Sequence, residues 1–368
     1  MRLLFSCGGS GGHINPAVAI AVEMKELFPD AQILFVGGKG KMEEELIPKA
    51  GFEFTGLSVD NLRRSISPRN LAHNVKSAYL AVSATIEARK IVRGFKPDAA
   101  IGTGGYACYP ALKAAARLGV PVLLHESNVL PGLATKMLEK SAAEMLLGFE
   151  DSLKYMRFPN KATVTGTPVR AEFRIASGRR SDADTKTVLS FWGSLGSKYL
   201  NERVPQLVEI IERSRSFRYV HAAGKNSSLP ERNTLYTEVK RYIYDMPSAM
   251  SGASLVICRS GAGTLNELAA AGKPAILIPS PFVTGNHQYP NAKTFADAGA
   301  AVLIEEKDAS AERLFKTAAE LLSDRTRLAS MSAAARALDN PGAAGRIAER
   351  IIEAINAKRG AGSMYSRE

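Results

Sequence analysis

The sequence has few of the residues from which metal and disulfide sites are built. Its three cysteines, Cys7, Cys108 and Cys258, are widely separated, and no CxxC or Cys/His cluster occurs. Neither a zinc site nor a disulfide framework is therefore expected, and a reducing cytoplasm is the simplest setting. No DxD-type pair of carboxylates lies near the glycine-rich segments described below, so a metal-held diphosphate is not indicated either.

Long apolar runs are also missing. The longest uncharged stretch, 274–292, is interrupted by proline, Asn, His and Gln. The apolar run after Met1 is too short for the core of a signal peptide. The sequence therefore predicts no membrane-spanning helix.

Positive charge is what the chain has in excess. The net charge of +12 indicates an anionic partner, which could be nucleic acid, an anionic membrane surface or a phosphorylated substrate. Nucleic acid fits least well, because aromatic residues make up only 7 % of the chain and no RNA-binding motif is visible. A length of 368 residues with 45 % hydrophobic content is typical of a globular protein with two domains.

Strand–loop–helix units occur in two successive series. Apolar runs predict strands at 3–6, 32–36, 98–101 and 121–124, and again at 187–191, 218–221, 254–258 and 275–278. This order predicts an α/β fold with two doubly wound, parallel-sheet domains. The expected divisions are 1–165, 166–340 and 341–368, of which the last is a C-terminal helix that returns to the N-terminal domain.

Three expected boundaries can be stated more closely. The helical spacing of apolar residues predicts that the first helix begins at Pro16. The polar and basic segment 166–184 has little apolar periodicity and is expected to be a connection. The C-terminal helix is expected to run from Pro341 to Ile355, with a frayed tail from Lys358.

Four glycine-rich loops follow predicted strands. They read GGSGGH (8–13), GTGGY (102–106), GSLGS (193–197) and RSGAGT (259–264). Glycine lets a ligand touch the backbone, and a loop that leads into a helix directs amide N–H groups at anions. A tight turn without a ligand would also need glycine, but four such loops at the carboxyl ends of strands favour anion binding. None is a GxGxxG dinucleotide fingerprint or a Walker A loop, which weighs against NAD and ATP.

Titratable groups occur beside these loops. His13 closes the first loop and is either a structural histidine or a general base. His125 and Glu126 follow the strand at 121–124 and are expected at the same rim. Glu267 lies on the first turns of the helix after the fourth loop, where it either favours the helix dipole or accepts hydrogen bonds from two ribose hydroxyls.

The motifs together resemble those of the MurG family, the membrane-associated N-acetylglucosaminyltransferases of bacterial peptidoglycan synthesis. The resemblance spans nearly the whole chain. It is carried by GGSGGHINPAVAIA (8–21), GTGGYACYPALKAA (102–115), HESNVLPGLATKML (125–138), GTPVR (166–170), GSLGS with LN (193–201) and CRSGAGTLNELAAAGKPAILIP (258–279).

This resemblance implies a GT-B fold, in which two Rossmann-like domains face a cleft. It implies an inverting enzyme that transfers GlcNAc from UDP-GlcNAc to the MurNAc 4-hydroxyl of lipid I, a polyprenyl-diphosphate-linked acceptor, to give lipid II. No metal or other cofactor is expected. The implied location is peripheral, at the cytoplasmic face of the cell membrane, with other cell-wall synthesis proteins as further partners.

The resemblance also assigns roles to residues. His13 or Glu126 would be the catalytic base. Acceptor contacts are expected from Gly8, Gly9, Gly102, Thr103, Gly104, Gly105 and Tyr106. UDP-GlcNAc contacts are expected from Ser10, Gly11, Gly12, Asn128, Arg170, Ser194, Ile243, Arg259, Ser260, Gly261, Ala262, Gly263, Thr264, Glu267, Gln288 and Asn291. Four positions depart from the usual family residues: Ser127, Thr167, Leu195 and His287.

Other functions are compatible with parts of this pattern. A diacylglycerol glycosyltransferase that uses a UDP-sugar would have the same fold and a neutral acceptor. A sugar-nucleotide epimerase would have the same kind of donor site but would release free ManNAc with UDP. A nucleic-acid-binding protein would account for the charge alone.

The span 61–96 combines positive charge with an apolar stripe. It has one acidic residue, Glu87, and its basic residues are Arg63, Arg64, Arg69, Lys76, Arg89, Lys90, Arg93 and Lys96. Apolar residues fall at helical spacing among them, at Leu71, Val75, Tyr79, Val82 and Ile86. These either pack on the N-terminal core or lie on an anionic leaflet, where each basic residue contributes about 1 kcal/mol.

Overall fold

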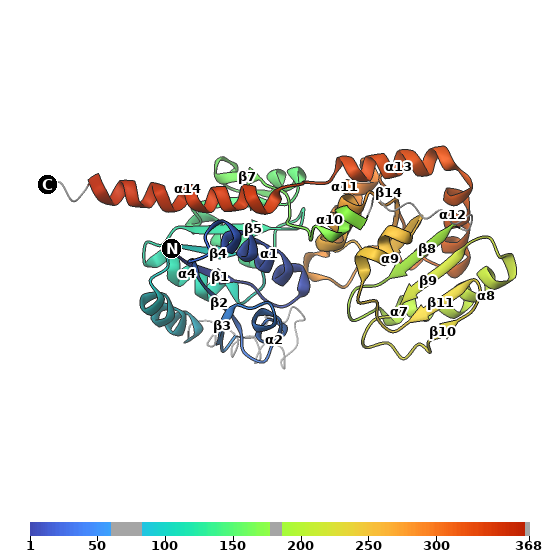
Figure 1. The fold of residues 1–368 in the computed structure, drawn as a ribbon, viewed down its shortest axis with the longest axis horizontal. Coiled ribbons are helices and arrows are strands. Elements are labelled where there is room, and N and C mark those ends of the chain that lie inside the picture. Colours follow the sequence, from blue (N-terminus) through green and yellow to red (C-terminus); the bar gives the residue numbers. More distant parts are fainter. Residues whose placement is uncertain (60–82, 177–185, 365–368) are drawn as a thin grey trace. The chain divides into compact units, whose positions relative to one another are not determined.

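The computed structural model describes residues 1–59, 83–176 and 186–364. The chain forms two units, Met1–Pro168 with Gly342–Glu368, and Val169–Pro341. Each unit contains a seven-stranded sheet with helices against its faces (Figure 1). The prediction of two doubly wound α/β domains is therefore confirmed.

The sheet of the N-terminal unit is parallel throughout, in the order β3-β2-β1-β4-β5-β6-β7. Its central strands are apolar runs buried on both faces, as parallel sheets require. The strands are β1 (Arg2–Ser6), β2 (Gln32–Gly38), β3 (Glu53–Leu57), β4 (Ala99–Gly102), β5 (Val122–Glu126), β6 (Glu144–Leu147) and β7 (Ala162–Val164).

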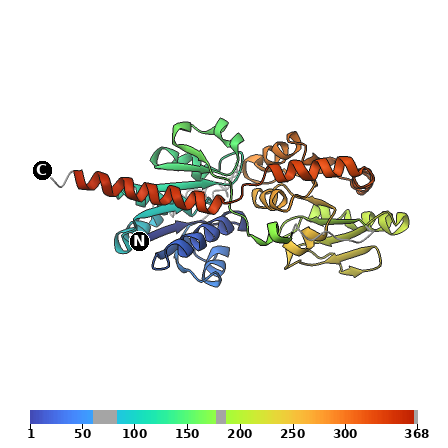
Figure 2. The ribbon, with the colours of Figure 1, turned by 45° about the horizontal axis from the view of Figure 1, so that its top comes forward.

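Helices of this unit include one from the far end of the chain. The α-helices are α1 (Gly11–Leu27), α2 (Met42–Lys49), residues 83–95, α4 (Cys108–Arg117), α5 (Leu133–Leu138) and α14 (Ala343–Met364). Short 3-10 turns lie at Glu139–Ser141, Glu150–Tyr155 and Pro159–Lys161. Figures 1 and 2 show α14 running beside α1. Ile347 and Ile351 of α14 are fully buried in one core with Phe5, Ile20 and Met24.

The C-terminal unit repeats the pattern. Its sheet has the order β10-β11-β9-β8-β12-β13-β14, and only β10 is antiparallel to its neighbour. The strands are β8 (Thr187–Phe191), β9 (Arg218–Ala222), β10 (Arg232–Asn233), β11 (Thr237–Lys240), β12 (Leu255–Cys258), β13 (Ala275–Leu277) and β14 (Ala301–Leu303). The α-helices are α6 (Glu172–Ala176), α7 (Lys198–Asn201), α8 (Val204–Ser214), α9 (Met246–Gly252), α10 (Ala262–Ala271), α11 (Gln288–Asp297), α12 (Ala311–Ser323) and α13 (Arg325–Ala337), with 3-10 turns at Thr284–Asn286 and Glu306–Asp308.

Both sheets have a switch point where the strand order reverses. In the N-terminal unit it lies between β1 and β4, where Ser6 pairs with Gly102. In the C-terminal unit it lies between β8 and β12, where Phe191 pairs with Cys258. Ligands of open α/β sheets bind at the carboxyl ends of the strands at such points. All four glycine-rich loops follow one of these four strands.

Three boundaries differ from the sequence prediction. The first helix begins at Gly11 and not at Pro16. Pro16 is the sixth residue of this helix and lacks the N–H that would bond the Gly12 carbonyl, but the helix continues through it. The expected connection contains α6, whose Phe173 is buried. The last helix continues to Met364, past the expected frayed tail from Lys358. Its residue Arg359 contacts Asp98 at 3.1 Å, which anchors this extension.

Candidate functional site

The first turn of α1 presents unbonded amide groups at the switch point of the N-terminal unit. Ser10 has an extended backbone and its side chain makes no capping bond, and the first turn has no acidic residue. The amides of Ser10, Gly11 and Gly12 donate to no acceptor among the described residues. Open N–H groups and the helix dipole make such a turn attractive to an anion.

The second loop packs directly on the first. The Gly8 amide donates to the Gly104 carbonyl at 3.2 Å. A Cβ on Gly104 would lie 2.6 Å from His13 Nδ1, and one on Gly105 would lie 2.1 Å from the Gly8 carbonyl oxygen. The φ angle is also positive at both glycines, 109° at Gly104 and 90° at Gly105. They are therefore needed to bring the two loops together.

Gly102 and Tyr106, at the two ends of the second loop, lie beside Leu112 and Gly9, respectively. Gly102 is buried as the last residue of β4, and a Cβ there would lie 2.3 Å from Leu112 Cδ1. Packing on α4 is thus sufficient reason for a glycine at 102. The Tyr106 ring lies beside Gly9, where a Cβ would be 3.5 Å from Cε1.

His13 is held in one tautomer by the second loop. Its Nδ1 lies 3.0 Å from the Thr103 carbonyl oxygen, and the Thr103 hydroxyl donates to the His13 carbonyl at 2.6 Å. Because a carbonyl oxygen only accepts, Nδ1 carries the proton and Nε2 is the basic nitrogen. The half-buried ring therefore carries its basic nitrogen at Nε2, and a general base needs such a nitrogen.

Glu126 is at the end of β5 and has both oxygens engaged. Oε1 accepts from the Asn128 backbone and side-chain amides at 3.0 and 3.1 Å. Oε2 accepts from the Gly132 amide at 2.9 Å and the Thr135 hydroxyl at 2.8 Å. The carboxylate is buried, and its four donors hold the segment that leads into α5. These contacts are typical of a structural carboxylate.

His125 is buried beside it and is neutral. Its Nε2 donates to the Gly166 carbonyl at 3.1 Å, and the Ser127 hydroxyl lies 3.3 Å from Nδ1. Burial lowers the pKa of His125 to about 4, against the opposing effect of the Gly166 bond. Ser127, one of the family departures, thus takes part in this network. Thr167, another departure, has a buried hydroxyl without a hydrogen-bond partner among the described residues.

The third loop, at the switch point of the C-terminal unit, packs on the turn after β9. A Cβ on Gly196 would lie 2.2 Å from the Ala223 carbonyl oxygen. The Lys225 amide donates to the Ser194 carbonyl at 2.9 Å. The loop tip faces solvent, since Ser194 is exposed and Leu195 is 55 % exposed.

Arg259 connects three elements of the C-terminal unit. Its guanidinium donates to Ser197 Oγ at 2.9 Å, to the Ile278 carbonyl at 3.1 Å and to the Glu306 carboxylate. Both charged groups are buried, and burial lowers the pKa of Arg259. The side chain therefore fixes the third loop against the end of β13.

The fourth loop is joined to the start of α11. The Ser260 hydroxyl donates to the Gln288 carbonyl at 2.8 Å, and Asn291 Nδ2 donates to the Ser260 carbonyl at 3.2 Å. Gln288 Oε1 accepts from the Ser280 amide at 2.8 Å. Three of the residues expected to contact the donor thus meet here. A Cβ on either Gly261 or Gly263 would meet nothing within 4 Å, so the start of α10 is open.

Glu267 lies on α10, about one and a half turns from that open end. It is half-buried, and its carboxylate makes no hydrogen bond or ion pair within the described residues. Burial raises its pKa to about 7, and the nearby positive charge of Arg170 opposes the shift. A carboxylate without donors has the capacity to accept two hydroxyl groups.

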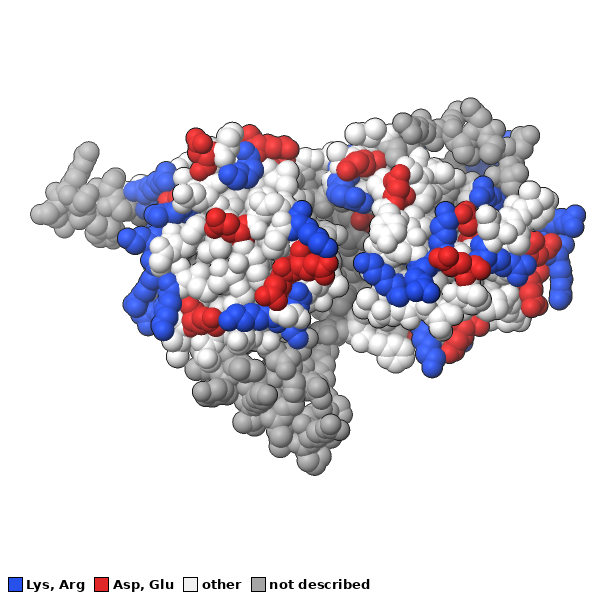
Figure 3. All heavy atoms as spheres, turned by 60° about the horizontal axis from the view of Figure 1, so that its bottom comes forward, with Lys and Arg blue, Asp and Glu red and all other residues white. Residues whose placement is uncertain are grey.

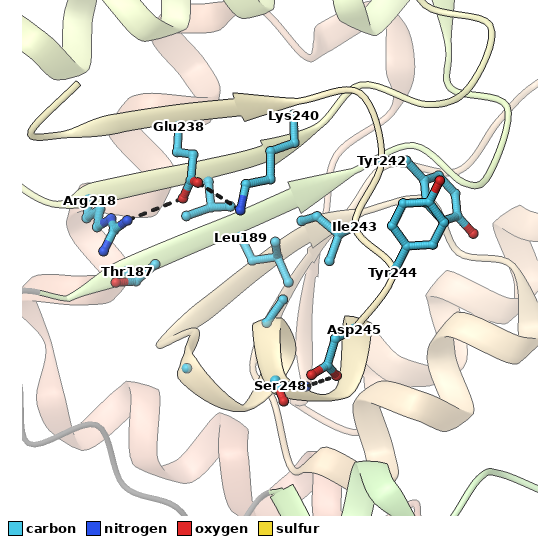
Figure 4. A pocket seen from close by; sticks show the side chains of 13 residues that line it. Thr187, Leu189, Arg218, Glu238, Lys240, Tyr242, Ile243, Tyr244, Asp245 and Ser248 are labelled. Atoms are coloured by element: carbon cyan, nitrogen blue, oxygen red, sulfur yellow. Dashed lines mark hydrogen bonds and ion pairs between the residues drawn. The ribbon is translucent and has the colours of Figure 1, made fainter. Parts of the chain in front are cut away.

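Ile243 lines a pocket of about 470 Å³ between α9 and the strands β8, β9 and β11. Figure 4 shows the ion-paired side chains of Arg218, Glu238 and Lys240 along one side and the Tyr242–Tyr244 pair at one end. Asp245 caps α9 through the Ser248 amide. The hydrogen bonds from Ser248 lower the pKa of Asp245, and the positive charge of Arg170 acts in the same direction.

Sequence reasoning missed two buried groups behind these loops. In the N-terminal unit, Glu43 accepts a hydrogen bond from the Gly9 amide at 3.2 Å. In the C-terminal unit, His221 bonds Ser190 at 2.7 Å and Asn201 at 3.2 Å, and Asn201 Nδ2 donates to the Ala223 carbonyl. The only feature of the sequence that could have indicated His221 is its position as a polar residue among apolar neighbours in β9.

The described residues contain neither a cluster of metal ligands nor a helix able to span a bilayer. Within residues 1–59, 83–176 and 186–364, no group of three His, Cys, Asp or Glu side chains could hold a metal ion. In the same residues, no helix has the length and apolar character needed to cross a bilayer.

Two Rossmann-like units with glycine loops at their switch points define the fold as GT-B. Models of the glycosyltransferase family 28 N-terminal and C-terminal domains match residues 3–147 and 187–348. The chain belongs to this family and, within it, to the MurG family of UDP-N-acetylglucosamine–N-acetylmuramyl-(pentapeptide) pyrophosphoryl-undecaprenol N-acetylglucosamine transferases.

The relatives that show this cover nearly the whole chain. The transferase of that name from Alkaliphilus metalliredigens is 39 % identical over 352 residues, which is 91 % of this chain and 94 % of the relative. The one from Acetivibrio thermocellus is 37 % identical over 374 residues, 98 % of this chain and all of the relative. The crystal structure of Acinetobacter baumannii MurG has a TM-score of 0.75, at 28 % identity, covering 96 % of this chain and 99 % of that one.

Proposed function

We propose that the protein transfers GlcNAc from UDP-GlcNAc to the MurNAc 4-hydroxyl of lipid I, with inversion, and so makes lipid II for peptidoglycan synthesis. The observation that carries this proposal is the near full-length similarity to transferases named for that reaction, at 37–39 % identity. The N-terminal unit would hold the acceptor, and the C-terminal unit would hold the donor together with Ser10, Gly11, Gly12 and Asn128 of the N-terminal unit.

His13 is the proposed base. The acceptor 4-hydroxyl would attack the anomeric carbon while His13 Nε2 takes its proton, and the bond from that carbon to UDP would break. The Nδ1 bond to the Thr103 carbonyl fixes the tautomer that this step needs. Glu126 is less suited, because its oxygens already accept four hydrogen bonds.

The leaving UDP would be stabilised by the loops at the second switch point. Ser194 and the open start of α10 offer hydroxyl and amide donors to its phosphates. Glu267 would accept the two ribose hydroxyls, and Ile243 would hold the uracil through its backbone. Gln288 and Asn291 would contact the sugar, although both already hold the fourth loop in place. Arg259 would act indirectly, by fixing the third loop.

Peripheral attachment to the cytoplasmic face of the membrane would bring the enzyme to its lipid-linked acceptor. On the helix at 83–95, the small apolar residues face the core, whereas Ile86 is 59 % exposed and Arg89, Lys90 and Arg93 are exposed. The rest of the basic span, including Arg63, Arg64, Arg69, Lys76 and the apolar residues from Leu71 to Val82, lies outside the described residues.

The alternative acceptor is tested by competition. Purified protein is given radiolabelled UDP-GlcNAc with a lipid I analogue, with diacylglycerol, or with both. The proposal expects label only in the lipid I analogue. Transfer to diacylglycerol would favour a glycolipid synthase, and release of free ManNAc with UDP would favour an epimerase.

A further inference from the structure

Glu43 is a buried carboxylate that none of the roles above uses. It is the second residue of α2 and is completely inaccessible to solvent. Oε1 accepts from the Gly38 amide at 2.9 Å, and Oε2 accepts from the Gly9 amide at 3.2 Å. Among the described residues, no Lys, Arg or His nitrogen lies within ion-pair distance of it.

Glycines make the space for this side chain. A Cβ on Gly8 would lie 2.5 Å from Glu43 Oε1, and one on Gly37 would lie 2.7 Å from Cγ. The pairs Gly8-Gly9 and Gly37-Gly38 follow β1 and end β2, so Glu43 fills the gap between two neighbouring strand ends. Gly8 of the first loop is therefore needed to make room for the Glu43 carboxylate of the same chain, and not only for a ligand.

Burying a carboxylate without a cation is costly unless its hydrogen bonds are strong. Both bonds here are charge-assisted and come from backbone amides. The bond from Gly9 fixes a residue with φ of 86°, immediately before the first turn of α1. It turns the Gly9 amide inward, whereas the amides of Ser10, Gly11 and Gly12 make no bond within the described residues.

We propose that Glu43 is a positioning residue: it holds the first glycine loop so that the open amides at the start of α1 meet a substrate diphosphate. Gly9 then contributes its conformation and not its amide to that contact. That the bound diphosphate belongs to a substrate rests on the proposed function, whereas the role of Glu43 in holding the loop does not.

The first test uses the unchanged protein, with amide exchange followed by NMR at single residues. The amides of Gly9 and Gly38 are expected to exchange slowly and those of Gly11 and Gly12 quickly. Inorganic diphosphate is expected to slow the exchange of the Gly11 and Gly12 amides and to leave the exchange of the Gly9 amide unchanged. Exchange at Gly9 as fast as at Gly11, or protection of Gly9 alone by diphosphate, would overturn the proposal.

The second test compares Glu43→Gln with Glu45→Gln, a change of an exposed carboxylate on the same helix that pairs with Lys49. The NH₂ group that Glu43→Gln introduces opposes one of the two backbone N–H groups. We expect kcat/KM for a lipid I analogue to fall at least about tenfold and exchange of the Gly9 amide to become faster, with the Glu45→Gln variant unchanged. Activity within twofold of the unchanged protein, or unchanged exchange of the Gly9 amide, would show that Glu43 has no positioning role.

The two proposals fail separately. If the unchanged protein transfers nothing to the lipid I analogue, the proposed function is wrong. The exchange pattern and its response to inorganic diphosphate would still decide the role of Glu43, because both are measured on the unchanged protein and need neither turnover nor a folded variant.

Discussion

At the scale of single residues, His13 and Glu126 differ in how their polar atoms are used. The carbonyl of Thr103 accepts a hydrogen bond from His13 Nδ1–H, so that Nε2 is the basic nitrogen. Glu126 spends both oxygens on the segment from Asn128 to Thr135. The first geometry is compatible with the proposed proton transfer, and the second holds a loop.

His13→Ala is expected to lower kcat by about a hundredfold or more, because the attacking hydroxyl loses its proton acceptor. Binding of UDP-GlcNAc, measured by calorimetry, is expected to stay near normal. Glu126→Gln serves as the comparison and is expected to lower the melting temperature. A kcat within a few-fold of the unchanged protein would make His13 structural and Glu126 the better base.

Glu267 is expected to make donor binding depend on pH. Its pKa is raised to about 7 by burial, so the carboxylate becomes protonated as the pH falls below 7. A protonated carboxyl accepts two hydroxyls poorly, and the affinity for UDP-GlcNAc should fall by up to about tenfold per pH unit below that value.

Calorimetric titration with UDP-GlcNAc between pH 5.5 and 8 measures this effect, about one and a half units below and one unit above that pKa. Glu267→Gln is expected to bind more weakly at pH 8 and to lose the pH dependence. Glu209→Gln, which changes an exposed carboxylate on α8, is the control and is expected to behave like the unchanged protein. Equal affinity across the range would show that the pKa of Glu267 is not raised, and a Glu267→Gln variant that binds UDP-GlcNAc as tightly as the unchanged protein at pH 8 would exclude a role for Glu267 in holding the ribose.

At the scale of elements, a buried polar chain joins β8, β9 and α7. His221 is fully buried between Ser190 and Asn201, and Asn201 holds the turn at Ala223 on which the third loop packs. Burial lowers the pKa of His221 to about 3. The folded protein therefore keeps this ring neutral while the unfolded chain binds a proton below its usual pKa of about 6.5.

This difference in pKa decides how the stability of the folded protein changes with pH. Because the unfolded state binds more protons, stability is lost as the pH falls from about 6.5 toward 3. Between pH 7 and pH 5 the loss is about 2 kcal/mol for each such histidine. His125, with a pKa lowered to about 4, contributes in the same direction.

Urea unfolding at pH 7 and pH 5 tests this expectation. His221→Gln has no proton to bind and should show a smaller loss between the two pH values, although it is less stable at pH 7. An unchanged loss in the variant would mean that His221 does not resist protonation in the folded state.

Most elements could be predicted from the sequence, since buried parallel strands are short apolar runs bounded by glycine. The strands beginning near Leu3 and Thr187 and the loops that follow them are confirmed. The start of α1 at Gly11 was missed because glycine does not fit a helix pattern, although it is tolerated in a first turn. Glu43 could not be predicted, because MEEEL reads as a solvated first turn until β1 and β2 bring Gly9 and Gly38 to it.

At the scale of the whole molecule, the charge excess is unevenly distributed. Figure 3 shows lysine and arginine side chains gathered along one edge of the N-terminal unit on the face in view. The whole chain carries a net charge of +12. Under the proposed function, this charge would attract the protein to an anionic leaflet, at about 1 kcal/mol for each nearby basic residue.

Sedimentation with vesicles tests this attraction. The protein is expected to sediment with anionic vesicles, to be released by high salt and to bind neutral vesicles weakly. Changing Arg63, Arg64 and Arg69 to Glu should weaken the binding, whereas changing Arg213, Arg215 and Arg218 of the C-terminal unit should not. Equal binding to neutral and anionic vesicles would show that the excess positive charge does not attach the protein to the membrane.

The central claim is an inverting transfer of GlcNAc onto a lipid-linked muramyl acceptor. Its most direct test is turnover of the purified protein with UDP-GlcNAc and a soluble lipid I analogue, with the product linkage determined by NMR. The account predicts one β-1,4-linked GlcNAc–MurNAc disaccharide for each UDP released, formed without added metal. An α-linkage, or UDP release without transfer to the MurNAc 4-hydroxyl, would contradict it.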